Sequence, residues 1–237
     1  MKRAGIACVA LLLATAAFAE LSHDEVKRLS EASAILTELR VTPEKGIPED
    51  LWNKAQCVMV IPSMKKAAFI VGGEYGSGVM SCRTGVNWTA PVFMQLTKGS
   101  WGLQIGAQQV DLVLLVMNRR GLDKLLQDKV SLGADASIAA GPVGRSASAA
   151  TDAQMSAEML SYSRAQGVFA GIDLSGGVLH PDKEADARAY GSAVSARDVA
   201  LGTSHIAAPV AADPFLRALR QETRGTSAAN EETRSNR

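Results

Sequence analysis

Apolar residues recur at helical spacing near the start of the chain and at strand-like spacing after Cys57. Ser22 and Glu25 form a capping box at the head of the helical segment, which should end near Arg40, before Pro43. A second, short helix is expected over 48–55. The first helix is predicted to bury one face, which comprises Val26, Leu29, Ala32, Ile35, Leu36 and Leu39.

Short apolar runs, separated by turn residues, follow from Cys57 onward. Pro62, Gly72-Gly73 and Lys98-Gly99-Ser100 are expected to end runs or to form bends and turns between strands. The run 110–117 is apolar on both faces apart from Asp111, as in a central strand. The predicted class is α+β: a largely antiparallel sheet, sandwich- or barrel-like, with an N-terminal amphipathic helix and short peripheral helices.

The second half of the chain continues this pattern up to residue 220. Gln166-Gly167 predicts a hairpin-like turn between two strands, and Asn118 is expected to cap a short helix. Further helices are expected over 183–190 and from Pro214 to Arg220. The small residues of 133–150 indicate close approach of backbones or layers rather than a linker. We therefore expect one domain over 20–220, followed by a disordered polar tail over 221–237.

The first 19 residues have the order of a cleavable export signal. Lys2 and Arg3 precede an apolar run from Ile6 to Phe18, and Ala17-Phe18-Ala19 fits a cleavage site. The run is shorter than the roughly 20 residues that span a bilayer as a helix. An uncleaved anchor or a buried helix is the alternative. The prediction is a mature protein that begins at Glu20 and resides in the periplasm or cell envelope.

Charge and cysteine content narrow the function classes. The chain has 25 Lys and Arg against 24 Asp and Glu, and cleavage removes two basic residues and no acidic one, which leaves a net charge near −1. Nucleic-acid binding normally requires a clearly basic surface, so it is not expected.

Cys57 and Cys82 are candidates for a disulfide in an oxidising compartment, with two buried free thiols as the alternative.

Residue patterns for catalysis are weak. The three histidines lie in separate segments without metal-ligand spacing, and neither G-x-S-x-G nor H-E-x-x-H occurs. The glycine-rich segment 72–78 lies between strands, so no helix N-terminus is available there to hold a phosphate. We expect no metal, no cofactor and no enzymatic activity. A hydrolase with an unrecognised site remains an alternative.

Several motifs, in the same order along the chain, resemble the SYLF-domain family. The resemblance covers roughly 22–202 and implies a phospholipid-binding module; eukaryotic relatives bind phosphoinositides and, in some fungal members, actin filaments. The segment 20–40 is acidic, unlike a helix that lies on anionic lipid, so we interpret it as packing on the core rather than anchoring to a membrane. The motifs are GVNWTAPVF (85–93), GSWGLQIGAQ (99–108), VMNRRGL (116–122), LGADAS and AAGPVGR (within 132–145), and YSRAQGVFAG (162–171).

The leading hypothesis is an exported, non-catalytic phospholipid-binding protein. Trp88 and Trp101 are candidates for interfacial aromatics, with burial in the sheet as the alternative. Export makes actin an unlikely partner. The competing hypothesis is an envelope protein that has a structural or protein-binding role and no lipid ligand. Basic side chains proposed for the headgroup are Lys65, Lys66, Arg119, Arg120 and Arg145.

Overall fold

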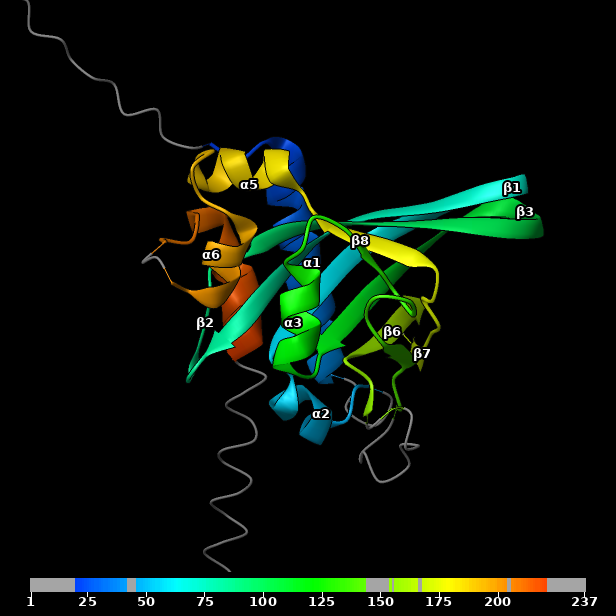
Figure 1. Cartoon of the computed structure of the whole chain (residues 1–237), viewed down its shortest axis with the longest axis horizontal. Coiled ribbons are helices and arrows are strands. Elements are labelled where there is room, and N and C mark those ends of the chain that lie inside the picture. Colours follow the sequence, from blue (N-terminus) through cyan, green and yellow to red (C-terminus); the bar gives the residue numbers. More distant parts are fainter. Residues whose placement is uncertain are drawn as a thin grey trace, which may run out of the picture.

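The computed structural model describes residues 20–41, 46–143, 154, 156–165, 168–203 and 206–220. Helices pack around one curled sheet (Figure 1). The strands are β1 (Cys57–Thr84), β2 (Asn87–Trp88), β3 (Val92–Val116), β4 (Val130–Ser131), β5 (Ile138–Ala140), β6 (Met159–Ala165), β7 (Val168–Gly171) and β8 (Gly177–Pro181). The helices are α1 (His23–Val41), α2 (Glu49–Lys54), α3 (Arg119–Leu125), α5 (Lys183–Tyr190), α6 (Ala196–Leu201), the 3-10 turn η2 (Val210–Ala212) and residues 213–220.

Strands β1 and β3 form one long antiparallel ribbon. Its register runs from Cys57 opposite Val116 to Met80 opposite Val92, and the ribbon projects beyond the rest of the sheet (Figure 1). The expected breaks at Pro62, Gly72-Gly73 and 98–100 were wrong, because both strands continue through them. The register of β1 against β3 shifts at two points instead. The two strands bend together, so their hydrogen-bonded pairing continues.

The two ends of β1 lie against each other. A Cβ atom on Gly78 would lie 2.4 Å from the carbonyl oxygen of Val60, and one on Gly76 would lie 2.5 Å from Cγ2 of Ile61. Only residues without a Cβ allow the two halves of the strand to approach this closely. This close approach accounts for the second part of the glycine-rich segment.

The sheet order is β2-β1-β3-β6-β5, and β3 changes partner along its length. Its first half pairs with β8 from Met94 to Lys98, and its second half pairs with β6 from Asp111 to Val116. β4 pairs with β8, β7 pairs with β6, and all pairings of the described strands are antiparallel except β5 with β6. The sheet therefore curls into a half-barrel, which confirms the α+β class.

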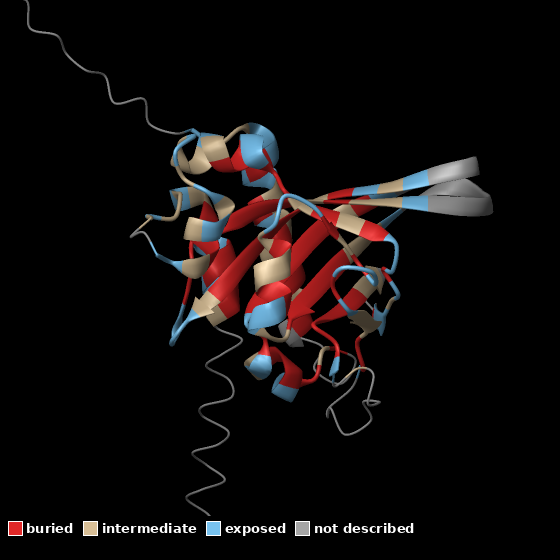
Figure 2. Ribbon diagram, viewed as in Figure 1, coloured by how far each residue is buried: buried red, intermediate tan, exposed pale blue. Residues whose placement is uncertain are grey.

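Two apolar cores lie on opposite faces of this sheet. Along β3, Val113 and Leu115 face the core covered by α1, α2 and residues 213–220, whereas Leu112 and Leu114 face the core closed by α3 and α6. Buried residues concentrate on the strands between the helices (Figure 2). The interpretation of 110–117 as a central strand is confirmed.

Helix α1 packs on the sheet, as expected, but at its first turn a different residue from the expected one faces inward. Leu29, Ala32, Ile35, Leu36 and Leu39 are buried, whereas Val26 is 41% exposed and Glu25 only 1% exposed. The Glu25 carboxylate accepts hydrogen bonds from the backbone N–H of Ser22 and from Arg188, so the capping residue occupies the inward position. Assigning Val26 to the buried face was wrong.

The remaining expectations fall into two groups. Asn118 caps α3 through the Gly121 N–H, as expected. At Gly141 an added Cβ would lie 2.0 Å from Cζ of Tyr162, so layers do approach closely in that part of the small-residue segment.

Some of the expectations fall on residues that the structure does not describe. These are the leader over 1–19, the turn at 166–167, Arg145 and the tail over 221–237. No helix in the described part of the chain combines the length and hydrophobicity needed to cross a membrane.

Candidate functional site

A groove of about 380 Å³ separates the first half of α1 from β1 and contains one of the predicted basic residues, Lys65. On the helix side, the lining residues are spaced three or four apart, so they share one face beside the buried one. On the strand side they come from both halves of β1. We call this the α1–β1 groove; it is lined by Asp24, Lys27, Arg28, Glu31, Pro62, Ser63, Lys65, Tyr75, Gly76 and Ser77.

A bulge at Pro62-Ser63 shapes the strand side of the groove. Ser63 has a φ of 49°, in the left-handed region, and its backbone N–H donates to Oδ1 of Asp111 at 2.9 Å. Arg164 donates to Oδ2 of Asp111 at 2.7 Å and also pairs with Glu38 of α1. Burial of the guanidinium opposes its charge, yet these two ion pairs raise the pKa of Arg164. The bulge is thus fixed relative to α1.

The charges on the helix side are largely neutralised by partners. Arg28 lies 3.1 Å from Asp182, and both side chains are mostly buried. Lys27 lies 3.8 Å from Glu31 in an exposed pair, where solvent screening weakens the attraction. Asp24, in the first turn of α1, is exposed and forms no ion pair with any residue that the structure describes.

The strand side offers a free ammonium beside hydroxyl groups. Lys65 is exposed and forms no ion pair within the described ranges. Ser77 donates its hydroxyl to the Tyr75 hydroxyl at 3.0 Å, and the Tyr75 side chain is 46% exposed. Opposite free charges therefore face one cavity, together with hydroxyl groups that can donate to an oxyanion.

The other predicted headgroup residues are placed differently. Arg119 lies 3.4 Å from Asp123, and Arg120 lies 3.0 Å from Glu158, so both α3 arginines have carboxylate partners. None of the described residues that line the α1–β1 groove belongs to α3. The side chain of Lys66 lies outside the described residues.

Glu158 is a buried anchor for α3. Lys124 lies 2.8 Å from each of its carboxylate oxygens, and the backbone N–H of Ser137 donates to Oε2 at 2.9 Å. Burial raises the pKa of this carboxyl, but the contacts with Lys124 and Ser137 outweigh burial and lower the pKa below its ordinary value. This network gives α3 a structural role and accounts for the position of Arg120.

Of the two tryptophans proposed as interfacial aromatics, the structure describes the side chain of Trp88 but not that of Trp101. Trp88 is 6% exposed and belongs to the core under α1, with the Arg83 guanidinium 4.5 Å from its ring centroid. It is therefore a core residue and not an interfacial aromatic.

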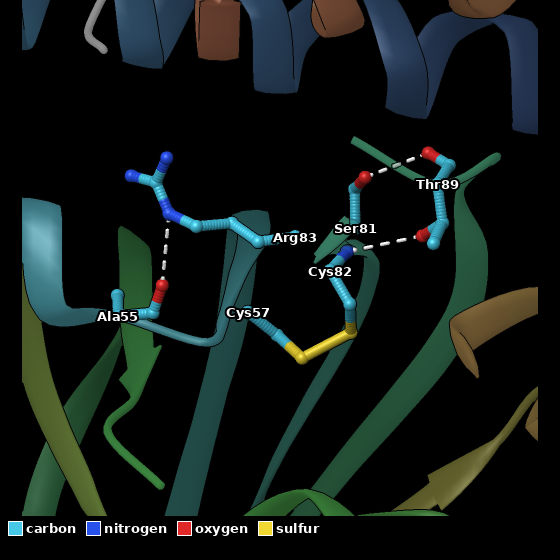
Figure 3. Close-up of a disulfide and its surroundings, with 6 residues drawn as sticks. All are labelled: Ala55, Cys57, Ser81, Cys82, Arg83 and Thr89. Carbon is cyan, nitrogen blue, oxygen red and sulfur yellow. Dashed lines mark hydrogen bonds between the residues drawn. A yellow bond between two sulfur atoms is a disulfide. The ribbon is translucent and has the colours of Figure 1, made fainter. Parts of the chain in front are cut away.

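The base of the β1–β3 ribbon is closed by a disulfide between Cys57 and Cys82 (Figure 3). Both cysteines are buried, and the Cys82 backbone N–H donates to Oγ1 of Thr89 at 3.1 Å. Beside them, Nε of Arg83 donates to the carbonyl oxygen of Ala55 at 3.0 Å, which satisfies the end of α2. The disulfide thus ties the beginning of β1 to its end.

Sequence reasoning missed most of the groove. Asp24, Lys27, Glu31, Tyr75 and Ser77 were not proposed as site residues, although the first three already share a helical face in the sequence. No group of three or more metal-ligating side chains gathers among the residues that the structure describes.

Comparison with known proteins gives a consistent family. The family model described as "Ysc84: Las17-binding protein actin regulator" matches residues 97–222. LAS seventeen-binding protein 3 of Saccharomyces cerevisiae is 31% identical over 180 residues, which is 74% of this chain and 39% of that protein. The SH3 domain-containing YSC84-like protein 1 of Xenopus laevis is 33% identical over 172 residues, which is 72% of this chain and 50% of that protein. The chain thus spans half or less of the length of these relatives.

Proposed function

Since the chain belongs to the Ysc84 (SYLF-domain) family, we propose that it is a non-catalytic binding protein whose α1–β1 groove holds the headgroup of a membrane phospholipid. The observation that carries the proposal is the free, exposed ammonium of Lys65 in a groove lined by serine and tyrosine hydroxyls. An ammonium group and hydroxyl donors together suit a phosphate diester.

The size and shape of the groove support a headgroup rather than an acyl chain. Its volume of about 380 Å³ is at the low end for small-molecule sites, and its lining is mostly polar. The exposed Tyr75 ring lies at the groove, where an aromatic side chain with a polar tip suits the membrane–water interface. The protein would therefore dock on a bilayer surface and leave the acyl chains in the membrane.

Vesicle sedimentation tests this proposal. We expect the protein to pellet with phospholipid vesicles, and Lys65→Glu to lower the affinity for them roughly fivefold or more, since one basic residue near an anionic surface contributes ~1 kcal/mol. Lys129→Glu is the matched control, because Lys129 is also exposed but lies outside the groove. The proposal fails if the protein stays in the supernatant with every vesicle composition. Unchanged binding by Lys65→Glu would remove the residue assignment alone.

Export and the absence of catalysis are part of the same proposal. The basic start, the apolar run and the cleavage site of residues 1–19 support export to the periplasm or envelope. N-terminal sequencing of the fractionated protein should give Glu20 as the first residue; an intact leader on cytoplasmic protein would contradict this. A panel of ester and phosphoester substrates should show no turnover above buffer, and turnover would identify a hydrolase.

A protein-binding role is the second candidate. It is favoured by the names of the relatives, which describe Las17-binding proteins and an actin regulator. Co-sedimentation with purified actin filaments separates the two candidates. Pelleting with filaments but with no vesicle would favour the protein-binding role over the phospholipid role.

A further inference from the structure

The two walls of the α1–β1 groove carry free charges of opposite sign. Asp24 on α1 and Lys65 on β1 both line it and are both exposed, yet no ion pair joins them to each other or to another described residue. The remaining charged groups of the lining are already paired, Arg28 with Asp182 and Lys27 with Glu31. A ligand that bridges the two walls must therefore carry both signs.

The helix wall disfavours a multiply charged anion. Asp24 and Glu31 both face the groove, and the positive end of the α1 dipole stabilises the Asp24 carboxylate because Asp24 lies in the first turn. These carboxylates would repel a second or third phosphate on a headgroup bound in the same groove. One phosphate near Lys65 and the Tyr75 hydroxyl leaves the helix wall free for a cation.

The chemistry of Asp24 also distinguishes between cations. A primary ammonium carries three N–H donors and can hydrogen-bond the carboxylate directly. A trimethylammonium group has no donor and is held best by several aromatic faces, whereas Tyr75 is the only aromatic residue among the described lining residues. The groove is therefore suited to a primary ammonium.

From this arrangement we infer that the α1–β1 groove selects a zwitterionic phosphate diester with a primary amine, the headgroup of phosphatidylethanolamine. Lys65 and the Tyr75 hydroxyl take the phosphate, and Asp24 takes the ammonium. The inference rests on the proposed function and names its ligand class.

The test compares vesicles of phosphatidylcholine alone with vesicles in which part of it is replaced by phosphatidylethanolamine or by phosphatidylglycerol. The protein should bind the phosphatidylethanolamine vesicles most tightly. Asp24→Asn should lower that binding roughly fivefold, the effect of an exposed ion pair of about 1 kcal/mol, without weakening binding to phosphatidylglycerol vesicles. Asp50→Asn is the matched control, because Asp50 is also an exposed acid in the first turn of a helix.

The outcomes separate this inference from the proposed function. Equal binding to phosphatidylethanolamine and phosphatidylglycerol vesicles, or a preference that survives Asp24→Asn, would overturn the headgroup assignment and leave phospholipid binding intact. Pelleting with no vesicle at all would overturn both. A soluble probe, glycerophosphoethanolamine, addresses the source of the ligand: binding to this probe without pelleting on phosphatidylethanolamine vesicles would overturn the lipid assignment in favour of a free phosphate ester.

Discussion

Asp186 on α5 should make the protein less stable as the pH rises, and Asp186→Asn should remove that dependence. The side chain is almost fully buried; its Oδ1 accepts the backbone N–H of Phe93 at 2.9 Å, and its Oδ2 accepts no hydrogen bond from a described residue. Burial is the main cause that raises the pKa of this carboxyl from 3.8 to about 7; the hydrogen bond from Phe93 lowers the pKa, the Asp182 carboxylate raises it, and Arg28 lowers it less. Below about pH 7 the neutral acid is therefore the favoured form in the folded protein.

The sign and the magnitude follow from the two pKa values. When folding raises the pKa of a carboxyl, its contribution to stability is fully present at pH values below its pKa in the unfolded state. This contribution is lost as the pH rises through its pKa in the folded state. The difference between 3.8 and about 7 corresponds to a loss on the order of 4 kcal/mol between pH 4 and pH 8. Asparagine keeps the acceptor for Phe93 and does not ionise.

Urea denaturation at pH values from 5 to 9 measures this effect as the free energy of unfolding. The wild-type curve should fall across the interval, and the Asp186→Asn curve should stay flatter and lie above it at pH 8. Asp50→Asn, which changes an exposed carboxylate, should follow the wild type. Parallel curves for wild type and Asp186→Asn would refute the reasoning.

Three further variants, one of them a double substitution, and one control test the ribbon and the α3 anchor by the same denaturation assay. Gly78→Ala should lower the free energy of unfolding by about 2 kcal/mol, because the added Cβ would overlap a carbonyl oxygen of the crossing half of β1. Gly99→Ala is the control and should stay near wild type, since its Cβ meets open space. Equal effects of the two substitutions would contradict this reasoning. Replacing both Cys57 and Cys82 by serine should cost about 3 kcal/mol for a loop with a separation of 25 residues, and an unchanged midpoint would argue against a disulfide. Glu158→Gln should lower the free energy of unfolding by about 2 kcal/mol at pH 7. The difference from wild type should shrink as the pH falls, because this carboxyl, whose pKa is lowered in the fold, stabilises the fold only while it is ionised. A difference that stays constant with pH would contradict the ion-pair explanation.

Local patterns in the sequence predicted the elements that depend on local physics. The period of α1, the cap at Asn118 and the two-faced run 110–117 all agree with the structure, because burial on one face or on both leaves a direct trace in the order of residues. The glycines of 72–78 were assigned to a bend between strands because a glycine cluster usually marks one. Their actual role at Gly76 and Gly78 is a contact with residues about fifteen positions earlier, which no local window contains.

The site was predictable only in part, for the same reason. Lys65 could be proposed because two adjacent lysines in an expected turn between strands suggest an exposed charge; the turn was wrong, since Lys65 lies within β1, but the side chain is exposed. Its position across the groove from Asp24 depends on how α1 lies on β1 and on the bulge at Pro62-Ser63, which a hydrogen bond from the Ser63 N–H to Asp111 holds in place. The arginines of α3 were weaker candidates than Lys65 in the sequence, and the structure gives them carboxylate partners both on α3 itself and on a distant segment.

The disulfide at the base of the ribbon makes the stretch from Cys57 to Cys82 a covalent ring. A protease that cuts one peptide bond inside this ring produces two fragments that remain a single molecule. The sulfur atoms joining them are buried and therefore protected from reductants that do not unfold the protein. A single cut in the β1 strand of the projecting ribbon therefore leaves the two parts of the chain covalently joined.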